Sequence, residues 1–251
     1  MPSHVISPRL SRTAVVALAA GLLLSGCSLD DTEQKTAAAD ATVGEAVTAV
    51  EVKEATSGSI EVTPGTGPGV TVHRTVHYRG DTAPTPGQRV SGGVLTFTDG
   101  CSDTCYIDYR LEIPASATVK LESSSGRITV AGVAGAELSS SSGDVRADRI
   151  AGPLKVRTSS GSVTATGLTG PTAELRASSG DASLTFAKPP ASVSAQTSSG
   201  DITLQVPQAP YRITTATASG KQDTPLPTTP TAPSRLSIRT SSGDIHITPT
   251  D

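Results

Sequence analysis

The sequence has 251 residues and a formal net charge of −3, with four tyrosines, two phenylalanines and no tryptophan. It contains no basic tract that could meet a row of phosphates, which argues against nucleic-acid binding. So few aromatic residues also argue against a bulky globular core. The composition favours a narrow fold whose interior is filled by small side chains.

The first 26 residues have the pattern of a bacterial lipoprotein signal peptide. Arg9 and Arg12 precede the apolar run TAVVALAAGLLL, which is too short to span a bilayer comfortably. The run ends in LSGC, a lipobox-like sequence in which Cys27 is expected to carry lipid and to become the N-terminus. The alternative is an ordinary secretory signal with an incidental cysteine. The lipobox predicts attachment to the extracytoplasmic face of the cell membrane through two acyl chains.

The rest of the chain divides into a short tether and a long repeat domain. Residues 27–46 lack strand alternation and are predicted to form a flexible tether. Residues 47–251 are predicted to form a repeat domain, irregular over 47–118 and regular over 119–248. The sequence leaves open whether the irregular part belongs to the same coil or is a separate small β domain.

A Ser-Ser-Gly motif, or a close variant, recurs at intervals of 17, 18, 19, 20, 20 and 23 residues, as in stacked-repeat proteins. Its glycines are Gly126, Gly143, Gly161, Gly180, Gly200, Gly220 and Gly243. An aspartate follows directly at Asp144, Asp181, Asp201 and Asp244. Glycine permits positive φ, and Ser and Asp side chains bond nearby backbone amides. The motif therefore predicts a tight corner in every repeat.

Small apolar residues alternate with polar ones on both sides of each corner. Around Gly126 the apolar positions are Val119 and Leu121 before it and Ile128 and Val130 after it. Period-two alternation predicts a strand on each side, with one buried face. The fold is therefore predicted to be an all-β solenoid of two-strand rungs of about 17–20 residues, stacked about 4.8 Å apart, with essentially no helix after the signal peptide.

The copy at Gly220 departs from this pattern. Its positions after the glycine, Gln222 and Thr224, are polar, and the Pro- and Thr-rich segment 223–234 follows. Such a segment predicts a loop that leaves the coil. Its O-glycosylation is left open.

The repeated SSGD motifs between short alternating strands resemble the bacterial putative-adhesin family of β-strand repeat proteins. The likeness covers residues 47–248 and is strongest over 119–248. It implies a β-solenoid and a non-enzymatic surface role, often in an extracytoplasmic lipoprotein. The Ala-, Thr- and Gly-rich composition with a lipobox looks like that of an actinobacterial protein.

Cys101 and Cys105 are the two cysteines that remain once Cys27 is lipidated. Outside the cytoplasm, a pair this close predicts a disulfide. The alternatives are a redox pair, which usually has two intervening residues rather than three, or half of a metal site.

The other candidate groups have simpler explanations than a site. The aspartate row could bind calcium, but one Asp per rung favours a role in the turns. His73 and His77 share one strand face without a paired carboxylate in the sequence nearby, a weak metal signal. Lys155, Arg157, Glu174 and Arg176 fit a solvated sheet face. No metal, cofactor or catalytic residue is predicted.

Two functions remain open. The first is a non-catalytic, membrane-anchored protein with an adhesin-like or envelope-structural role, whose expected partners are the membrane, through Cys27, and a cell-wall polymer or an envelope protein. The alternative is a polysaccharide-active lyase or hydrolase on the same scaffold, which would need clustered acids or bases in a sugar-binding groove.

Overall fold

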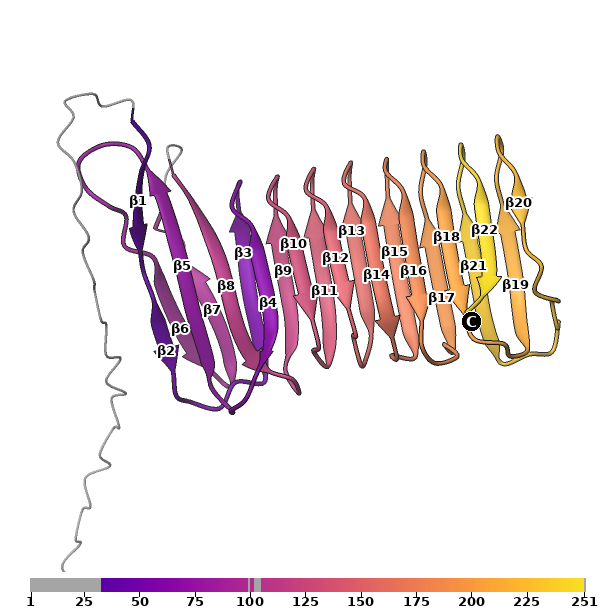
Figure 1. Cartoon of the computed structure of the whole chain (residues 1–251), viewed down its shortest axis with the longest axis horizontal. Helices are drawn as coiled ribbons and strands as arrows, with labels where there is room; N and C mark the ends of the chain where they lie inside the picture. Colours follow the sequence, from indigo (N-terminus) through magenta and orange to yellow (C-terminus); the bar gives the residue numbers. More distant parts are fainter. Residues whose placement is uncertain (1–32, 99, 102–104, 251) are drawn as a thin grey trace, which may run out of the picture.

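The computed structural model describes residues 33–98, 100–101 and 105–250, and these form two sheets that face each other in a long stack (Figure 1). Sheet A runs through β1 (Lys35–Ala38), β5 (Val70–Tyr78), β8 (Tyr106–Pro114), β4 (Ile60–Gly65), β10 (Ile128–Ala131), β12 (Val145–Asp148), β14 (Val163–Leu168), β16 (Ala182–Phe186), β18 (Ile202–Val206), β22 (Ile245–Pro249) and β20 (Gln222–Asp223), with β2 (Ala41–Val43) beside β5. Sheet B runs through β6 (Gly87–Ser91), β7 (Val94–Thr98), β3 (Ala49–Ala55), β9 (Thr118–Ser123), β11 (Gly135–Ser140), β13 (Leu154–Thr158), β15 (Thr172–Ala177), β17 (Ser192–Gln196), β21 (Ser234–Arg239) and β19 (Tyr211–Ala216). The prediction of an all-β solenoid is confirmed, and the described ranges contain no helix.

Each regular rung contains one strand from each sheet. The chain runs along β9 in sheet B, reverses at the Ser-Ser-Gly corner, returns along β10 in sheet A, and turns again into β11 beside β9. The pairing is parallel and in register, with Val119 opposite Ala136 and Ile128 opposite Val145. Parallel neighbours need a crossover connection, and here the strand in the opposite sheet supplies it.

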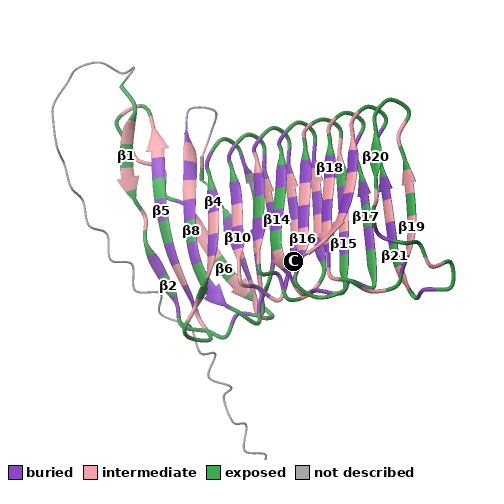
Figure 2. Cartoon of the chain, turned by 45° about the vertical axis from the view of Figure 1, so that its right-hand side comes forward, coloured by how far each residue is buried: buried purple, intermediate pink, exposed green. Residues whose placement is uncertain are grey.

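The core lies between the two sheets and is built from equivalent positions of successive rungs. Leu121, Leu138 and Val156 pair in register, and each is at most 1% exposed. Buried and exposed residues alternate along the strands (Figure 2). Because mostly aliphatic side chains of two facing strands fill each layer, the coil needs few aromatic residues, among them the buried Phe186 and Tyr211.

The C-terminal rungs do not stack in chain order. The last strands, β21 and β22, lie between β17/β18 and β19/β20, so that β19 and β20 form the end of the stack although they precede β21 in sequence (Figure 1). The polar Gln222 and Thr224 are tolerated because Gln222 belongs to this last rung and is exposed, while Thr224 follows the end of β20. The loop that leaves the rung afterwards returns the chain to the inner position. It also pairs with the edge of β19, where Thr229 donates its amide to the Tyr211 carbonyl (2.7 Å).

The N-terminal rungs are also out of order. The β3/β4 rung lies between β7/β8 and β9/β10, because β3 pairs with both β7 and β9 while β4 pairs with both β8 and β10. Leu95 and Phe97 of β7 are buried in the core, and Gly93 lies in the turn of the antiparallel β6–β7 hairpin, not at a solenoid corner. The irregular residues thus continue the same two sheets.

The predicted tether is wrong for residues 35–43. These residues form β1 and β2, which pair antiparallel with β5 at the end of sheet A. They are anchored by Arg74, an inward-facing residue of β5 that is 5% exposed and whose Nε donates to the Ala39 carbonyl (2.7 Å). Burial lowers the pKa of Arg74. An arginine at an apolar position of the alternation is what the sequence pattern could not anticipate.

Candidate binding surface

The glycines of the corners form a continuous ladder through the coil. A Cβ added to Gly143 would lie 2.1 Å from the Gly126 carbonyl oxygen, and one added to Gly161 would lie 2.1 Å from that of Gly143. The same contact recurs at Gly180, Gly200, Gly243 and Gly220, in that spatial order. Positive φ is not the reason at Gly126, Gly143 or Gly161, which have none. There the motif requires glycine because adjacent rungs leave no room for a side chain.

The aspartates after the glycines bridge adjacent rungs. Asp181 accepts a hydrogen bond from the Asp201 amide (2.9 Å), and Asp201 accepts one from the Asp244 amide (2.7 Å). Asp244 in turn accepts from the Lys221 amide (2.7 Å), and Asp144 accepts from that of Ser162 (3.2 Å). The sequence predicted bonds within each turn, but the amide belongs to the next rung. Each carboxylate thus has a structural task, and no group of three metal-ligating side chains occurs among the described residues.

The two serines before each glycine are exposed, and we call them the serine rows. Their members in spatial order are Ser124 and Ser125, Ser141 and Ser142, Ser159 and Ser160, Ser178 and Ser179, Ser198 and Ser199, Ser241 and Ser242, and Ser219. Their backbone amides hold the rungs together; that of Ser142, for example, donates to the Ser124 carbonyl (2.7 Å). Within the described part of the chain, none of their hydroxyls donates or accepts a side-chain hydrogen bond. These hydroxyls therefore face solvent with their bonding capacity unused by the fold.

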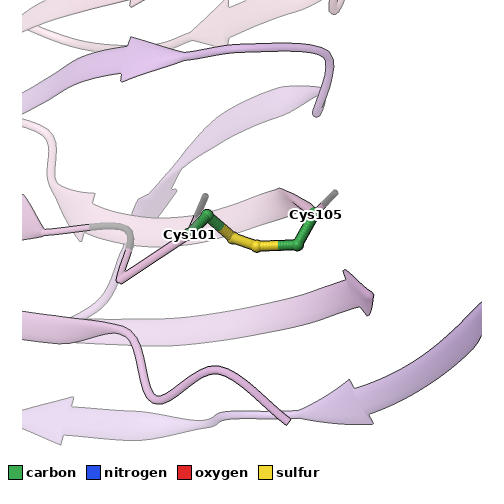
Figure 3. Close-up of a disulfide and its surroundings, with 2 residues drawn as sticks. All are labelled: Cys101 and Cys105. Atoms are coloured by element: carbon green, nitrogen blue, oxygen red, sulfur yellow. A yellow bond between two sulfur atoms is a disulfide. The ribbon is translucent and has the colours of Figure 1, made fainter. Parts of the chain in front are cut away.

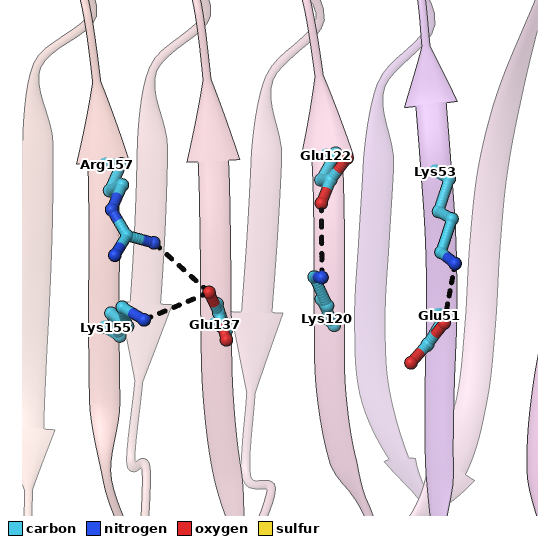
Figure 4. A network of polar contacts seen from close by, with 7 residues as sticks. All are labelled: Glu51, Lys53, Lys120, Glu122, Glu137, Lys155 and Arg157. Carbon is cyan, nitrogen blue, oxygen red and sulfur yellow. Dashed lines mark hydrogen bonds and ion pairs between the residues drawn. The ribbon is translucent and has the colours of Figure 1, made fainter.

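Charged side chains cover the outer face of sheet B in its N-terminal half, and they neutralise one another. Glu137 binds both Lys155 (3.3 Å) and Arg157 (3.2 Å), its neighbours on β13 (Figure 4). Arg176 pairs with Glu174 on β15 at 3.0 Å. The hydrogen bond from Lys155 holds the pKa of Glu137 below its ordinary value. The predicted cluster is thus brought together on one face, but as a solvated ion-pair ladder.

Two shallow grooves follow the edge of sheet B beside the serine rows. The first has a volume of about 460 Å³ and is lined by Glu122, Ser123, Ser124, Ser139, Ser140, Ser141, Arg157, Thr158 and Ser159. The second has a volume of about 350 Å³ and is lined by Gln196, Thr197, Ala216, Thr217, Ala218, Arg239, Thr240 and Ser241. They occupy the same position in different rungs, so hydroxyl groups recur at this edge of sheet B along the stack.

The two histidines of β5 each face their own carboxylate. His73 lies 3.3 Å from Asp40, while His77 lies 2.9 Å from Asp108 and stacks on Tyr106. Asp108 also accepts hydrogen bonds from the amide and the hydroxyl of Ser59, both 2.7 Å. It thereby takes the place that a ladder aspartate has elsewhere, which the sequence could not reveal because no Ser-Ser-Gly motif precedes it.

Asp108→Asn is expected to lower Tm at neutral pH by about 3 °C, the shift for about 1 kcal/mol in a chain of this size. Burial alone would raise the pKa of Asp108, but its bonds to Ser59 and His77 outweigh burial and lower it. A lowered pKa stabilises the fold above the unfolded value of about 3.9, and this contribution is lost as the pH falls through the folded value. Tm of the wild type and Tm of Asp108→Asn, measured from pH 7 downward, should therefore converge in acid. Glu45→Gln, which removes an exposed carboxylate, should leave Tm unchanged at both neutral and acid pH. If the difference in Tm between wild type and Asp108→Asn were the same at all pH values, the role of the ionised carboxylate would be contradicted.

Cys101 and Cys105 are joined in a disulfide with their Cα atoms 5.5 Å apart (Figure 3), so this prediction is confirmed. The bond closes a short loop between β7 and β8, with Cys105 at the edge of the core.

Replacing both cysteines by serine is expected to cost about 2 kcal/mol of unfolding free energy, since a short loop loses little entropy on closure. Denaturant unfolding with and without reductant would measure it. Alkylation of both thiols without prior reduction would contradict the bond.

The remaining predicted residue, Cys27, lies outside the described residues, as does the whole signal peptide. Among the residues that the structure does describe, no helix has the length and apolar character needed to cross a membrane.

Several solved structures are similar to this chain. They include a putative adhesin from Bacteroides fragilis NCTC 9343, at 15% identity over 87% of this chain and 98% of that one, with a TM-score of 0.48. A putative adhesin from Parabacteroides merdae ATCC 43184 has 13% identity over 88% and 97%, with a TM-score of 0.46. A putative cell adhesion protein from Clostridium sporogenes ATCC 15579 has 11% identity over 87% and 100%, with a TM-score of 0.38.

No curated protein matches the chain with significance. Its sequence does match a protein family, over residues 49–248, a span that runs from the first strand of the β3/β4 rung almost to the end of β22. This span includes every Ser-Ser-Gly corner described above. The chain therefore belongs to the Toastrack DUF4097 family.

Proposed function

We propose that this protein is a lipoprotein held at the outer face of the cell membrane through Cys27, and that its solenoid is a non-catalytic binding surface for a polymer of the cell envelope. The serine rows carry the proposal. They repeat a pair of free hydroxyls at six of the seven corners, and a single one at Ser219, at the spacing of the rungs along the regular coil. A row of this kind suits a linear, hydroxyl-rich partner that makes many weak contacts.

The nature of the faces agrees with this role. The ladder aspartates accept backbone amides, and the acids on sheet B are held in ion pairs, so both sets already have structural partners. The grooves beside the serine rows are shallow, and serine and threonine residues contribute to the lining of both. Repeated weak hydrogen bonds along such a surface gain strength through effective concentration.

The anchoring is tested by expressing the full chain and its Cys27→Ala variant in an actinobacterial host. The wild type is expected in the membrane fraction and cleavable by protease added outside protoplasts. The variant is expected in the medium. Equal sedimentation of both, or a protected cytosolic wild type, would contradict the anchor.

The binding role is tested by retention of the purified protein on isolated cell-wall material. Saturable retention is expected, and it should fall when Ser124, Ser141, Ser159 and Ser178 are replaced by alanine. The matched control replaces Thr129, Thr164, Ser183 and Thr203, which lie on the outer face of sheet A. Retention that both sets reduce equally, or no retention at all, would overturn the role of the serine rows.

A further inference from the structure

The C-terminal end of sheet B carries a cationic patch that differs from the rest of this face. We define it as Arg212 on β19 with Arg235 and Arg239 on β21. The other outward residues of the last three strands are polar or small: Ser192, Ser194, Gln196, Ser237, Thr214 and Ala216. No acid occupies an outward position on these strands, whereas each sheet B strand from β3 through β9, β11 and β13 to β15 contributes at least one charged residue to the ion-pair ladder.

The three arginines are not neutralised. Among the described residues, none of them forms an ion pair with a carboxylate. Arg235 and Arg239 are exposed, and the Nε of Arg212 donates to the Pro230 carbonyl (2.8 Å), a neutral acceptor. Asp201 and Asp244, the ladder acids of the neighbouring rungs, follow the corner glycines on the side of sheet A and accept backbone amides.

The patch also costs stability. Arg212 and Arg235 are direct partners in the register of β19 and β21, and like charges in that position destabilise a sheet. Arg157 and Arg176 are paired in the same way further along the sheet, but each has a glutamate beside it. An unneutralised pair kept at the surface is better explained by a ligand than by folding.

The groove beside the patch offers hydroxyl groups to a ligand. The second groove, about 350 Å³, has Arg239 on its wall and Gln196 and Ser241 in its lining, next to the serine row. Arg235 and Arg239 are four residues apart on β21, so their guanidinium groups are widely spaced. The patch thus has two separate centres of positive charge, the Arg212–Arg235 pair and Arg239, beside a groove that contains hydroxyl groups. This arrangement fits a polymer with spaced negative charges and many hydroxyls. The patch lacks the large apolar side chains that would enter a lipid layer.

From these observations we propose that the patch of Arg212, Arg235 and Arg239, with the adjoining groove, binds a linear acidic polysaccharide through its carboxylates and hydroxyls. Guanidinium groups bind carboxylates with two parallel hydrogen bonds, and the serine, threonine and glutamine side chains bond the sugar hydroxyls. This inference rests on the proposed binding role, since it names the chemical class of the polymer and its site.

The test is calorimetric titration of the purified full-length chain with polygalacturonate oligosaccharides. Binding is expected at low salt and should weaken as salt is raised. Arg235→Gln with Arg239→Gln should weaken it about tenfold, the effect of two partly exposed charge contacts. Lys155→Gln with Arg176→Gln, two ion-paired cations on the same face that line neither groove, should change it less than about twofold. Removing the like charge should leave Tm of the first variant unchanged or higher, which distinguishes lost contacts from lost folding.

Equal weakening by both pairs of substitutions would overturn the inference. So would the absence of binding at low salt, or tighter binding to polyphosphate or to phosphatidylglycerol vesicles than to polygalacturonate. Retention on wall material without binding to polygalacturonate would refute the acidic polysaccharide alone and leave the proposed function standing. Neutral maltodextrin of the same length should bind weakly, and equal binding would show that the arginines are not used.

Discussion

Gly143→Ala is expected to destabilise the protein by about 3 kcal/mol, at the upper end of the cost of overpacking. A Cβ at this position would lie 2.1 Å from the carbonyl oxygen of Gly126. That oxygen belongs to backbone held by hydrogen bonds on both sides, so it cannot move away as a flexible side chain would. The unfolding free energy measured in denaturant would show the loss.

Gly67→Ala is the matched control, because nothing lies within 4 Å of a Cβ placed there and its φ is not positive. It should be close to neutral. If Gly143→Ala were equally mild, the corners would tolerate a wider spacing than the structure shows, and the glycine ladder would not explain the repeated motif.

A chain that ends at Pro233 is expected to lose the order of two rungs although it lacks only one. The deletion removes β21 and β22, on which β19 and β20 depend for their pairing. In a coil stacked in chain order, the same cut would only shorten one end. Hydrogen exchange should therefore show loss of protection over β19. The deletion should also uncover Val193 and Leu204, which are buried in the whole chain, so that a hydrophobic dye binds there.

A chain that ends at Thr250 is the control, since it retains all of β22. It should match the wild type. Full protection of β19 in the shorter chain would mean that this strand pairs directly with β17, and the inner position of β21 would then matter little for stability.

The regular rungs could be predicted from the sequence because local pattern determines them. Alternation around Gly143 and Gly161 fixes which residues face inward, and their constant offsets from the corner glycine fix the register. The order of the rungs at the two ends could not be predicted, because β3 and β21 carry patterns that fit beside several strands. Their positions depend on pairing with strands separated from them in the sequence, and this information is not local.

The candidate surface was predicted only in part. The sequence placed Lys155, Arg157 and Arg176 on one face, but the pairing that neutralises them required the register of adjacent strands. Arg235 and Arg239 did carry a signal, since they stand at outward offsets from Gly243 without a glutamate at the same offsets in nearby repeats. Arg74 and Asp108 gave none, because their roles depend on contacts with segments distant in the sequence. Arg74 bonds Ala39, between β1 and β2, while Asp108 bonds Ser59 and His77.

The β3/β4 and β21/β22 rungs, which lie out of chain order, make the two ends of the stack different from its middle. Among the described residues, strands β9 to β18 each pair within their sheet only with the equivalent strands of the two adjacent rungs. A repeat copied or removed there would change the length of the stack by about 4.8 Å. At each end, by contrast, the β3/β4 or the β21/β22 rung is inserted between two other rungs. A repeat added there would compete with that rung for the same strand edges. Repeats can therefore be added or removed only in the middle of the stack, and the two ends keep the same structure at any length.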